Sequence, residues 1–206
     1  MTSLKPTLAK NTAELAASFQ QIPEARKELL QHLSNYIQEK RKAGQTIRLV
    51  FICTHNSRRS HMAQLWAQAA ATYYKLDDVV TFSGGTESTA FYPAAVKAMQ
   101  ELGFEVEKEN NDNNPIYKVY YADNAAPVEV WSKKYDHKAN PTTGFCAVMT
   151  CTEADGDCPF VEGAEKRLAI PYEDPKISDG TADQEQVYLE RARQIGREML
   201  YVLSKV

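Results

Sequence analysis

A short apolar run that leads into a polar loop and then a helix constrains this fold more than any other feature. Residues 47–52 read Ile-Arg-Leu-Val-Phe-Ile, which is typical of a buried parallel strand. Residues 53–57 form a polar turn, and residues 58–75 carry apolar side chains at helical spacing. A strand, a tight loop and a helix in this order predict a βαβ unit, and therefore a parallel sheet with helices on its faces.

The same alternation continues towards the carboxyl terminus. Further strands are expected at residues 79–82, 145–150 and 167–170, and further helices at 93–102 and 182–204. We therefore expect one α/β domain over residues 46–206. Residues 105–140 break its pattern: a polar stretch precedes two short apolar runs, 116–121 and 128–131, which predict a hairpin inserted on one edge of the sheet.

Residues 1–45 differ in character from the rest and predict a helical extension. One short helix is expected to start at Asn11, and a second to be opened by Pro23 and ended by Gly44. Their apolar stripes favour packing against one side of the domain. A dimerisation or partner surface is the alternative.

Composition excludes several classes of function. The formal net charge is −3, whereas a nucleic-acid-binding domain normally carries a strong basic excess. No apolar run approaches the roughly 18 residues of a membrane span. The first residues also lack the apolar segment of a signal peptide, so we expect a cytoplasmic protein without nucleic-acid or membrane partners.

The four cysteines are the first candidates for chemistry. They are Cys53, Cys146, Cys151 and Cys158. In a cytoplasmic chain they are expected to be thiols rather than structural disulfides. No C-x-x-C pair is present, which disfavours zinc, although Cys151 and Cys158 could bind it together with Cys146 or a histidine. We expect no metal, and Cys146, inside a predicted strand, is expected to be inert.

The loop after the first strand predicts an oxyanion site. Cys53 and Arg59 are separated by five residues between a buried strand and a helix, where backbone N–H groups and the helix N-terminus favour an anion. Arg59 offers a planar two-pronged donor, and Cys53 would be a nucleophile whose thiolate is favoured by this potential. Taken singly, an inert buried thiol and a surface ion pair are the alternatives. The expected oxyanion-binding residues are Thr54, His55, Asn56, Ser57, Arg58, Arg59 and Ser60.

These residues carry a family resemblance. Residues 52–60 resemble the phosphate loop of the low-molecular-weight protein tyrosine phosphatase superfamily, which includes the thioredoxin-coupled arsenate reductases. Residues 83–87 resemble the segment that closes its second strand, and Tyr172-Glu-Asp-Pro175 resembles its Asp-Pro acid loop. The resemblance implies a three-layer fold, with a four-stranded parallel sheet flanked by helices. It also implies that Asp174 protonates the leaving oxygen; capping of a turn is the alternative role.

The loop departs from the family pattern at two positions. His55 stands where the family usually has glycine, and histidine tolerates a positive φ less well than glycine does. Arg58 replaces a second loop cysteine, which adds a positive charge near the site.

A second cysteine pair favours a reductase over a phosphatase. Cys151 and Cys158 lie in a segment that resembles the redox segment of thioredoxin-coupled arsenate reductases. The resemblance implies that Cys151 attacks Cys53, that Cys158 then attacks Cys151, and that thioredoxin, rather than a bound cofactor, supplies the electrons. Residues 152–157 are small and polar, as a mobile relay loop would be.

We therefore expect an arsenate reductase that acts through a thiol–disulfide relay. The alternative is a low-molecular-weight phosphotyrosine protein phosphatase that hydrolyses phosphate monoesters through a phosphocysteine. Lys176-Ile177 stands where such phosphatases usually place an aromatic residue, which weakens the alternative. A third possibility is a non-catalytic oxyanion-binding module, which the complete Cys53, Arg59 and Asp174 set disfavours.

Overall fold

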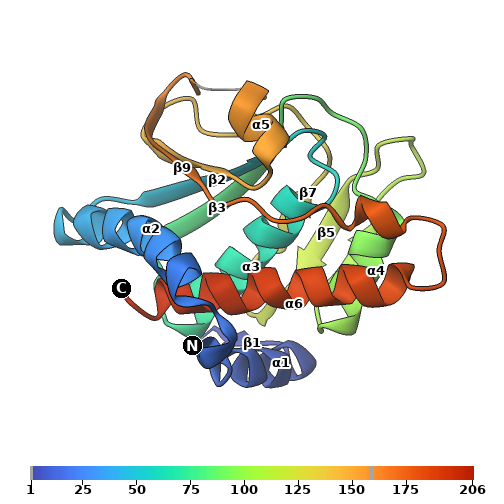
Figure 1. The fold of residues 1–206 in the computed structure, drawn as a ribbon, viewed down its shortest axis with the longest axis horizontal. Coiled ribbons are helices and arrows are strands. Elements are labelled where there is room, and N and C mark those ends of the chain that lie inside the picture. The colour runs from blue at the N-terminus through green and yellow to red at the C-terminus, as the bar shows by residue number, and fades with distance from the viewer. Residues whose placement is uncertain (1, 158–159) are drawn as a thin grey trace.

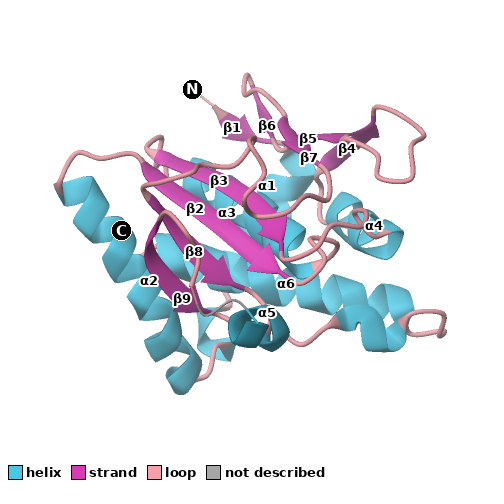
Figure 2. Cartoon of the chain, turned by 90° about the horizontal axis from the view of Figure 1, so that it is seen from above, coloured by secondary structure: helices cyan, strands magenta, loops and turns pink. Residues whose placement is uncertain are grey.

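A four-stranded parallel sheet forms the centre of the molecule. The computed structural model describes residues 2–157 and 160–206, and the sheet has the strand order β3-β2-β8-β9 (Figure 2). Its strands are β2 (Ile47–Cys53), β3 (Val79–Gly85), β8 (Phe145–Met149) and β9 (Ala164–Ala169). All three strand pairs are parallel, which confirms the expected sheet and brings the carboxyl ends of the strands to one edge.

The helices cover the two faces of this sheet unequally (Figures 1 and 2). One face carries α3 (Arg59–Tyr73), which packs on β2 and β3, and α6 (Gln184–Leu203), which packs on α3 and on α4 (Pro93–Glu101). The opposite face forms a smaller apolar cluster with Ala154 of the short helix α5 (Thr152–Asp157). The expected flanking helices are therefore present, but most of them lie on one side.

Helix α5 occupies a segment for which the sequence predicts a mobile loop. Its residues are small and polar, but Ala154 is fully buried against the sheet, together with Met149 and Val161. The segment is therefore helical and makes a buried contact that its polarity does not reveal, and its mobility stays a prediction.

The amino-terminal extension packs on the helical face. It consists of β1 (Ser3–Leu4), α1 (Pro6–Ala16), a 3₁₀ turn (Phe19–Gln21) and α2 (Glu24–Lys42). The first helix begins at Pro6 rather than Asn11, because proline fits the first helical turn, and the Asn11 amide donates to the Thr7 carbonyl inside the helix. The buried apolar residues of the extension include Leu8 and Leu15 of α1 and Leu30, Leu33 and Ile37 of α2.

The segment 105–140 forms a sheet of its own. The expected hairpin is present as β5 (Tyr117–Tyr120) and β7 (Val128–Val130), and β4 (Glu105–Lys108) adds a third antiparallel strand. The hairpin itself does not join the main sheet, and its Tyr117, Val119 and Val130 pack into the common core. The segment still meets an edge of that sheet, because Lys134 forms a parallel bridge with Gly85 at the end of β3. A further strand, β6 (Ala122–Asp123), pairs with β1, so extension and insertion contact each other.

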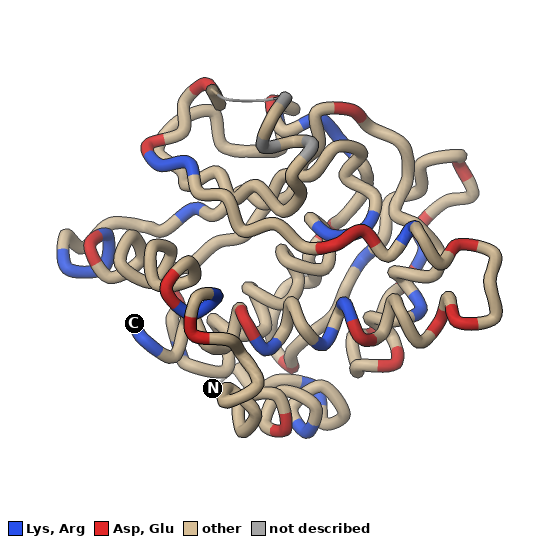
Figure 3. The backbone as a smooth tube through the Cα atoms, viewed as in Figure 1, with Lys and Arg blue, Asp and Glu red and all other residues tan. Residues whose placement is uncertain are grey.

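Charged residues of both signs are interspersed along the chain (Figure 3). Among the residues that the structure describes, no helix combines the length and apolarity needed to cross a membrane. The last short element before α6 is a 3₁₀ turn, Pro175–Ser178, which is capped by the side chain of Asp174.

Candidate active site

The loop between β2 and α3 is held by the end of β3. The Thr54 carbonyl accepts a hydrogen bond from the Glu87 N–H at 2.8 Å. A Cβ on Gly85 would lie 2.6 Å from that carbonyl oxygen and 2.7 Å from the Asn56 nitrogen. Only glycine permits this approach, so the last residue of β3 sets the course of the loop.

Asn56 is the residue of this loop with a left-handed backbone conformation. Its φ is 45°, which asparagine adopts more readily than most residues, whereas His55 is not among the residues with positive φ. The expected strain at His55 is therefore absent, and its imidazole lies on the rim, 3.6 Å from the Glu87 carboxylate. The buried Asn56 amide donates to the Ser60 hydroxyl at 2.8 Å and accepts from the Lys133 N–H at 2.9 Å.

The inserted segment braces the same loop. The Ser132 hydroxyl donates to the His55 carbonyl at 2.8 Å and accepts from the Thr89 N–H at 2.7 Å. Ser132 and Lys133 thus fix the peptide around His55 from outside the minimal fold. The sequence gives no signal for this role, because the contacts join residues 77 positions apart.

Cys53 lies at the bottom of this arrangement. It ends β2 and is only 3% exposed. Its Sγ lies 3.0 Å from the Ser60 hydroxyl, in the first turn of α3. The thiol therefore lies at the amino-terminal end of α3.

Arg59 and Asp174, for which the sequence predicts separate roles, are in direct contact. One Arg59 nitrogen, Nη2, donates to Asp174 Oδ2 at 2.7 Å, and Nη1 donates to the Tyr172 carbonyl at 3.0 Å. The other Asp174 oxygen accepts from the Lys176 N–H, so this carboxylate also caps the turn that follows. Both roles considered for Asp174 are thus compatible with its contacts.

The Arg58 guanidinium binds residues outside the anion loop. Its guanidinium donates to Asp179 at 2.7 Å and to the Tyr188 hydroxyl at 2.6 Å, and it stacks over the Tyr92 ring. Partial burial opposes the charged form, but these partners outweigh it and raise the pKa of Arg58. Its charge is therefore engaged by Asp179, and its contribution to the oxyanion loop is its backbone.

Cys151 lies beside the loop, because β2 and β8 are adjacent parallel strands. It is fully buried, and its Sγ lies 3.6 Å from the Thr54 hydroxyl and 3.4 Å from the Ala154 nitrogen. Burial raises the pKa of the Cys151 thiol, against the lowering effect of those two hydrogen bonds and of Arg59. The Cys151 thiol therefore lies next to the loop that follows Cys53, and its raised pKa favours the protonated form.

The two remaining cysteines are Cys146 and Cys158. Cys146 is fully buried inside β8, and burial raises the pKa of its thiol to about 12, as expected of inert core. Cys53, Cys146 and Cys151 are all free thiols. Cys158 lies outside the described residues. Within residues 2–157 and 160–206, no group of three His, Cys, Asp or Glu side chains could hold a metal ion.

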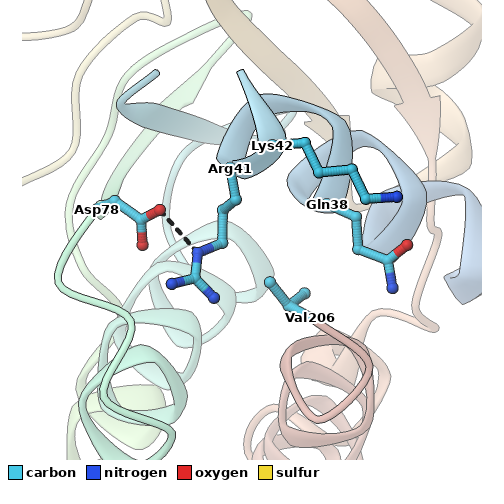
Figure 4. A pocket seen from close by; sticks show the side chains of 5 residues that line it. All are labelled: Gln38, Arg41, Lys42, Asp78 and Val206. Carbon is cyan, nitrogen blue, oxygen red and sulfur yellow. Dashed lines mark hydrogen bonds and ion pairs between the residues drawn. The ribbon is translucent and has the colours of Figure 1, made fainter. Parts of the chain in front are cut away.

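A groove opens beside the anion loop. Its volume is about 300 Å³, and its walls include His55, Ser57, Tyr92 and Lys176. A second cavity, of about 460 Å³, lies at the opposite end of the sheet, next to Asp78 and the ion-paired Arg41 (Figure 4). The groove is therefore lined by residues of the loop that follows Cys53, and the cavity of Figure 4 is not.

Known proteins resemble this chain in sequence and in fold, although no family model matches it. An arsenate reductase of Bacillus subtilis (strain 168) is 29% identical over 152 residues, which is 73% of this chain and 91% of the relative. An arsenate reductase of Staphylococcus aureus (strain Newman) is 28% identical over 129 residues, 62% of this chain and 77% of the relative.

Solved structures share the fold at lower identity. A low-molecular-weight phosphotyrosine phosphatase from Vibrio cholerae O395 superposes with a TM-score of 0.53 at 14% identity, covering 77% of this chain and 95% of its own. An arsenate reductase in a phosphate-binding state gives 0.50 at 17% identity, covering 78% and 98%. By fold the chain is of the low-molecular-weight phosphatase type, and by sequence it is a relative of the bacterial enzymes named arsenate reductase.

Proposed function

We propose that this protein reduces arsenate to arsenite through Cys53 and a thiol relay. The observation that carries the proposal is the place of Cys151, whose Sγ lies 3.6 Å from the hydroxyl of Thr54, the residue next to Cys53. Hydrolysis of a phosphate ester has no need of a second thiol at this place, whereas a two-electron reduction does. The relatives named arsenate reductase support the same activity.

The first step is a displacement at arsenic. Arsenate would be bound by the loop N–H groups and by Arg59, the Cys53 thiolate attacks arsenic, and a bond between sulfur and arsenic(V) forms. One arsenate oxygen leaves as water, and Asp174, 2.7 Å from Arg59, supplies the proton that this oxygen needs.

The second step transfers the electrons. The Cys151 thiolate attacks Cys53 Sγ, the Cys53–Cys151 disulfide forms, and the electron pair of the sulfur–arsenic bond stays on arsenic. Arsenic(V) thereby becomes arsenic(III) and leaves as arsenite. Cys158 would attack Cys151 to release Cys53, and a reduced thioredoxin would reduce the resulting Cys151–Cys158 disulfide.

A phosphatase activity is the second candidate, and the groove of about 300 Å³ favours it. This groove adjoins the anion loop and could hold the alcohol part of a phosphate ester. Water would then resolve a phosphocysteine at Cys53, with Asp174 protonating the leaving alcohol.

Paired assays on one preparation separate the two candidates. We expect arsenate reduction with thioredoxin, thioredoxin reductase and NADPH in the wild type, and none in Cys53→Ser or Cys151→Ser. Any aryl phosphate hydrolysis should be lost in Cys53→Ser and kept in Cys151→Ser. A wild type that hydrolyses aryl phosphates well and leaves arsenate unreduced would overturn the reductase proposal.

A further inference from the structure

Arg26, in the amino-terminal extension, reaches the segment that carries the acid. Its guanidinium lies over the Tyr172 ring, 4.8 Å from the ring centroid. It also donates to Glu198 Oε2 through Nε at 3.0 Å and Nη2 at 2.8 Å. Glu198 is only 3% exposed, so this ion pair fixes the guanidinium plane against the ring.

Tyr172 connects this contact to the catalytic arginine. Its N–H donates to the Thr150 carbonyl at 3.0 Å, and its own carbonyl accepts from Arg59 Nη1 at 3.0 Å. Two residues further on, Asp174 accepts from Arg59 Nη2. Two acceptors of the Arg59 guanidinium therefore lie on the segment against which Arg26 packs.

The backbone bond to Thr150 and an ion pair between Glu173 and Arg191, at 2.9 Å, also hold the Tyr172 segment. On the side of the Tyr172 ring, Arg26 is a charged contact of this segment. A cavity of about 410 Å³ lies beside it, with Pro23, Arg26, Glu173 and Glu198 among its walls. Removal of the Arg26 side chain would enlarge this cavity next to the Tyr172 ring. The segment could then relax towards it, and the carbonyl bonded to Arg59 would move too.

We propose that Arg26 is a positioning residue for the oxyanion site: it holds Tyr172 and thereby orients Arg59 and Asp174. The inference rests on the proposed function, in which Arg59 binds the oxyanion. It gives the amino-terminal extension a part in the chemistry, although residues 1–45 lie outside the minimal fold. Misplacement of a positioned group by about 1 Å can lower a rate about a hundredfold.

Kinetics of variants test the proposal. We expect Arg26→Ala to lower kcat for arsenate about ten- to a hundredfold, with a smaller change in KM. Because Arg26→Ala leaves Glu198 buried without its partner, the double variant Arg26→Met, Glu198→Gln removes both charges and retains side-chain volume. It should melt near the wild-type temperature and still show the lowered kcat.

A thiol-labelling ratio tests the geometry without turnover. Iodoacetate is an anion that Arg59 draws towards Cys53, whereas iodoacetamide is neutral. In both reactions the Cys53 thiolate displaces iodide, and mass spectrometry of the Cys53 peptide gives the rates. We expect the iodoacetate-to-iodoacetamide ratio to fall at least threefold in the double variant, and to fall similarly in Arg59→Ala.

Arg41→Ala is the matched control. Arg41 lies on the same helix, α2, and pairs with Asp78 at 2.8 Å at the far end of the sheet. It should keep the wild-type kcat and labelling ratio. A folded double variant with both values unchanged would overturn the role of Arg26, whereas a wild type without turnover but with the expected labelling shift would overturn only the proposed reaction.

Discussion

Gly85 shapes the anion loop through the absence of a side chain. An added Cβ would lie 2.3 Å from the Glu87 carbonyl oxygen and 2.6 Å from that of Thr54. These are backbone atoms, so the loop itself would have to move. The course of the proposed oxyanion loop therefore depends on Gly85, a residue of the neighbouring strand β3.

Gly85→Ala is accordingly expected to weaken phosphate binding at least tenfold. Overpacking of this kind should also lower the free energy of unfolding by about 1–3 kcal/mol. Titration calorimetry with inorganic phosphate and urea unfolding measure the two effects. Wild-type phosphate affinity in the folded variant would show that the loop tolerates the added methyl group.

Lys133 is a buried cation that the reaction does not use. Its side chain lies over the Trp131 ring, and burial lowers the pKa of its ammonium group to about 8. In the unfolded chain this pKa is near 10.5, so between pH 8 and 10.5 the unfolded state binds more protons. The free energy of unfolding therefore increases as pH rises through this window. Below pH 8 the buried charge of Lys133 lowers the free energy of unfolding by about 3 kcal/mol.

Lys133→Met should consequently stabilise the protein at pH 7, by about 2–3 kcal/mol. The advantage over wild type should shrink at pH 10, where Lys133 is neutral in the folded state. Urea unfolding of both proteins at the two pH values measures the difference. An advantage independent of pH would contradict the assignment to the buried charge.

Single residues differ in how far the sequence could predict them. Strand, loop and helix signals around a short motif single out Cys53 and Arg59, whereas Asp174 is singled out only by the family resemblance, and the roles of all three stay predictions. No such signal marks Ser132 and Lys133, because they bond to the loop through hydroxyl and backbone groups across a long chain separation. His55 attracted attention as a departure from glycine, but the left-handed position is Asn56.

At the scale of elements, the parallel pairing of β2 with β8 explains why two distant cysteines meet. Ile52 is paired with Met149, so Cys53, the last residue of β2, and Cys151, two residues beyond the end of β8, lie near the same edge. The alternation of strands and helices predicts such a sheet. It does not predict that 105–140 forms a separate sheet, because strand patterns do not specify their partners.

The burial of Cys151 gives the second step a pH dependence. Since its pKa is raised, the thiolate that attacks Cys53 is scarce at neutral pH and becomes more abundant as pH rises. Disulfide formation after the first step should therefore accelerate from pH 7 to pH 9. Quenched single-turnover reactions, analysed by mass spectrometry, measure this rate, and a flat profile would place rate control elsewhere.

At the scale of the whole molecule, the extension is part of the same core as the domain. Leu33 is fully buried on α2, and the Ser34 hydroxyl donates to the Val202 carbonyl of α6 at 3.0 Å. The composition of residues 1–45 predicts amphipathic helices but not these partners. The extension also pairs with the insertion through β1 and β6, which joins the two segments outside the minimal fold.

We therefore expect one unfolding transition for the whole chain. Leu33→Ala should lower the free energy of unfolding by about 2–5 kcal/mol and shift that single transition. Calorimetry together with near- and far-ultraviolet circular dichroism tests the coincidence. An early separate transition of the extension that leaves phosphate binding intact would contradict the shared core.

The most direct test of the central claim is the chemical state of Cys53 after one arsenate turnover. In Cys158→Ser the relay should stop after its second step. Peptide mass spectrometry of that variant, after one equivalent of arsenate, should show a Cys53–Cys151 disulfide and one equivalent of arsenite. Free Cys53 and Cys151 thiols with arsenate unreduced would contradict the account.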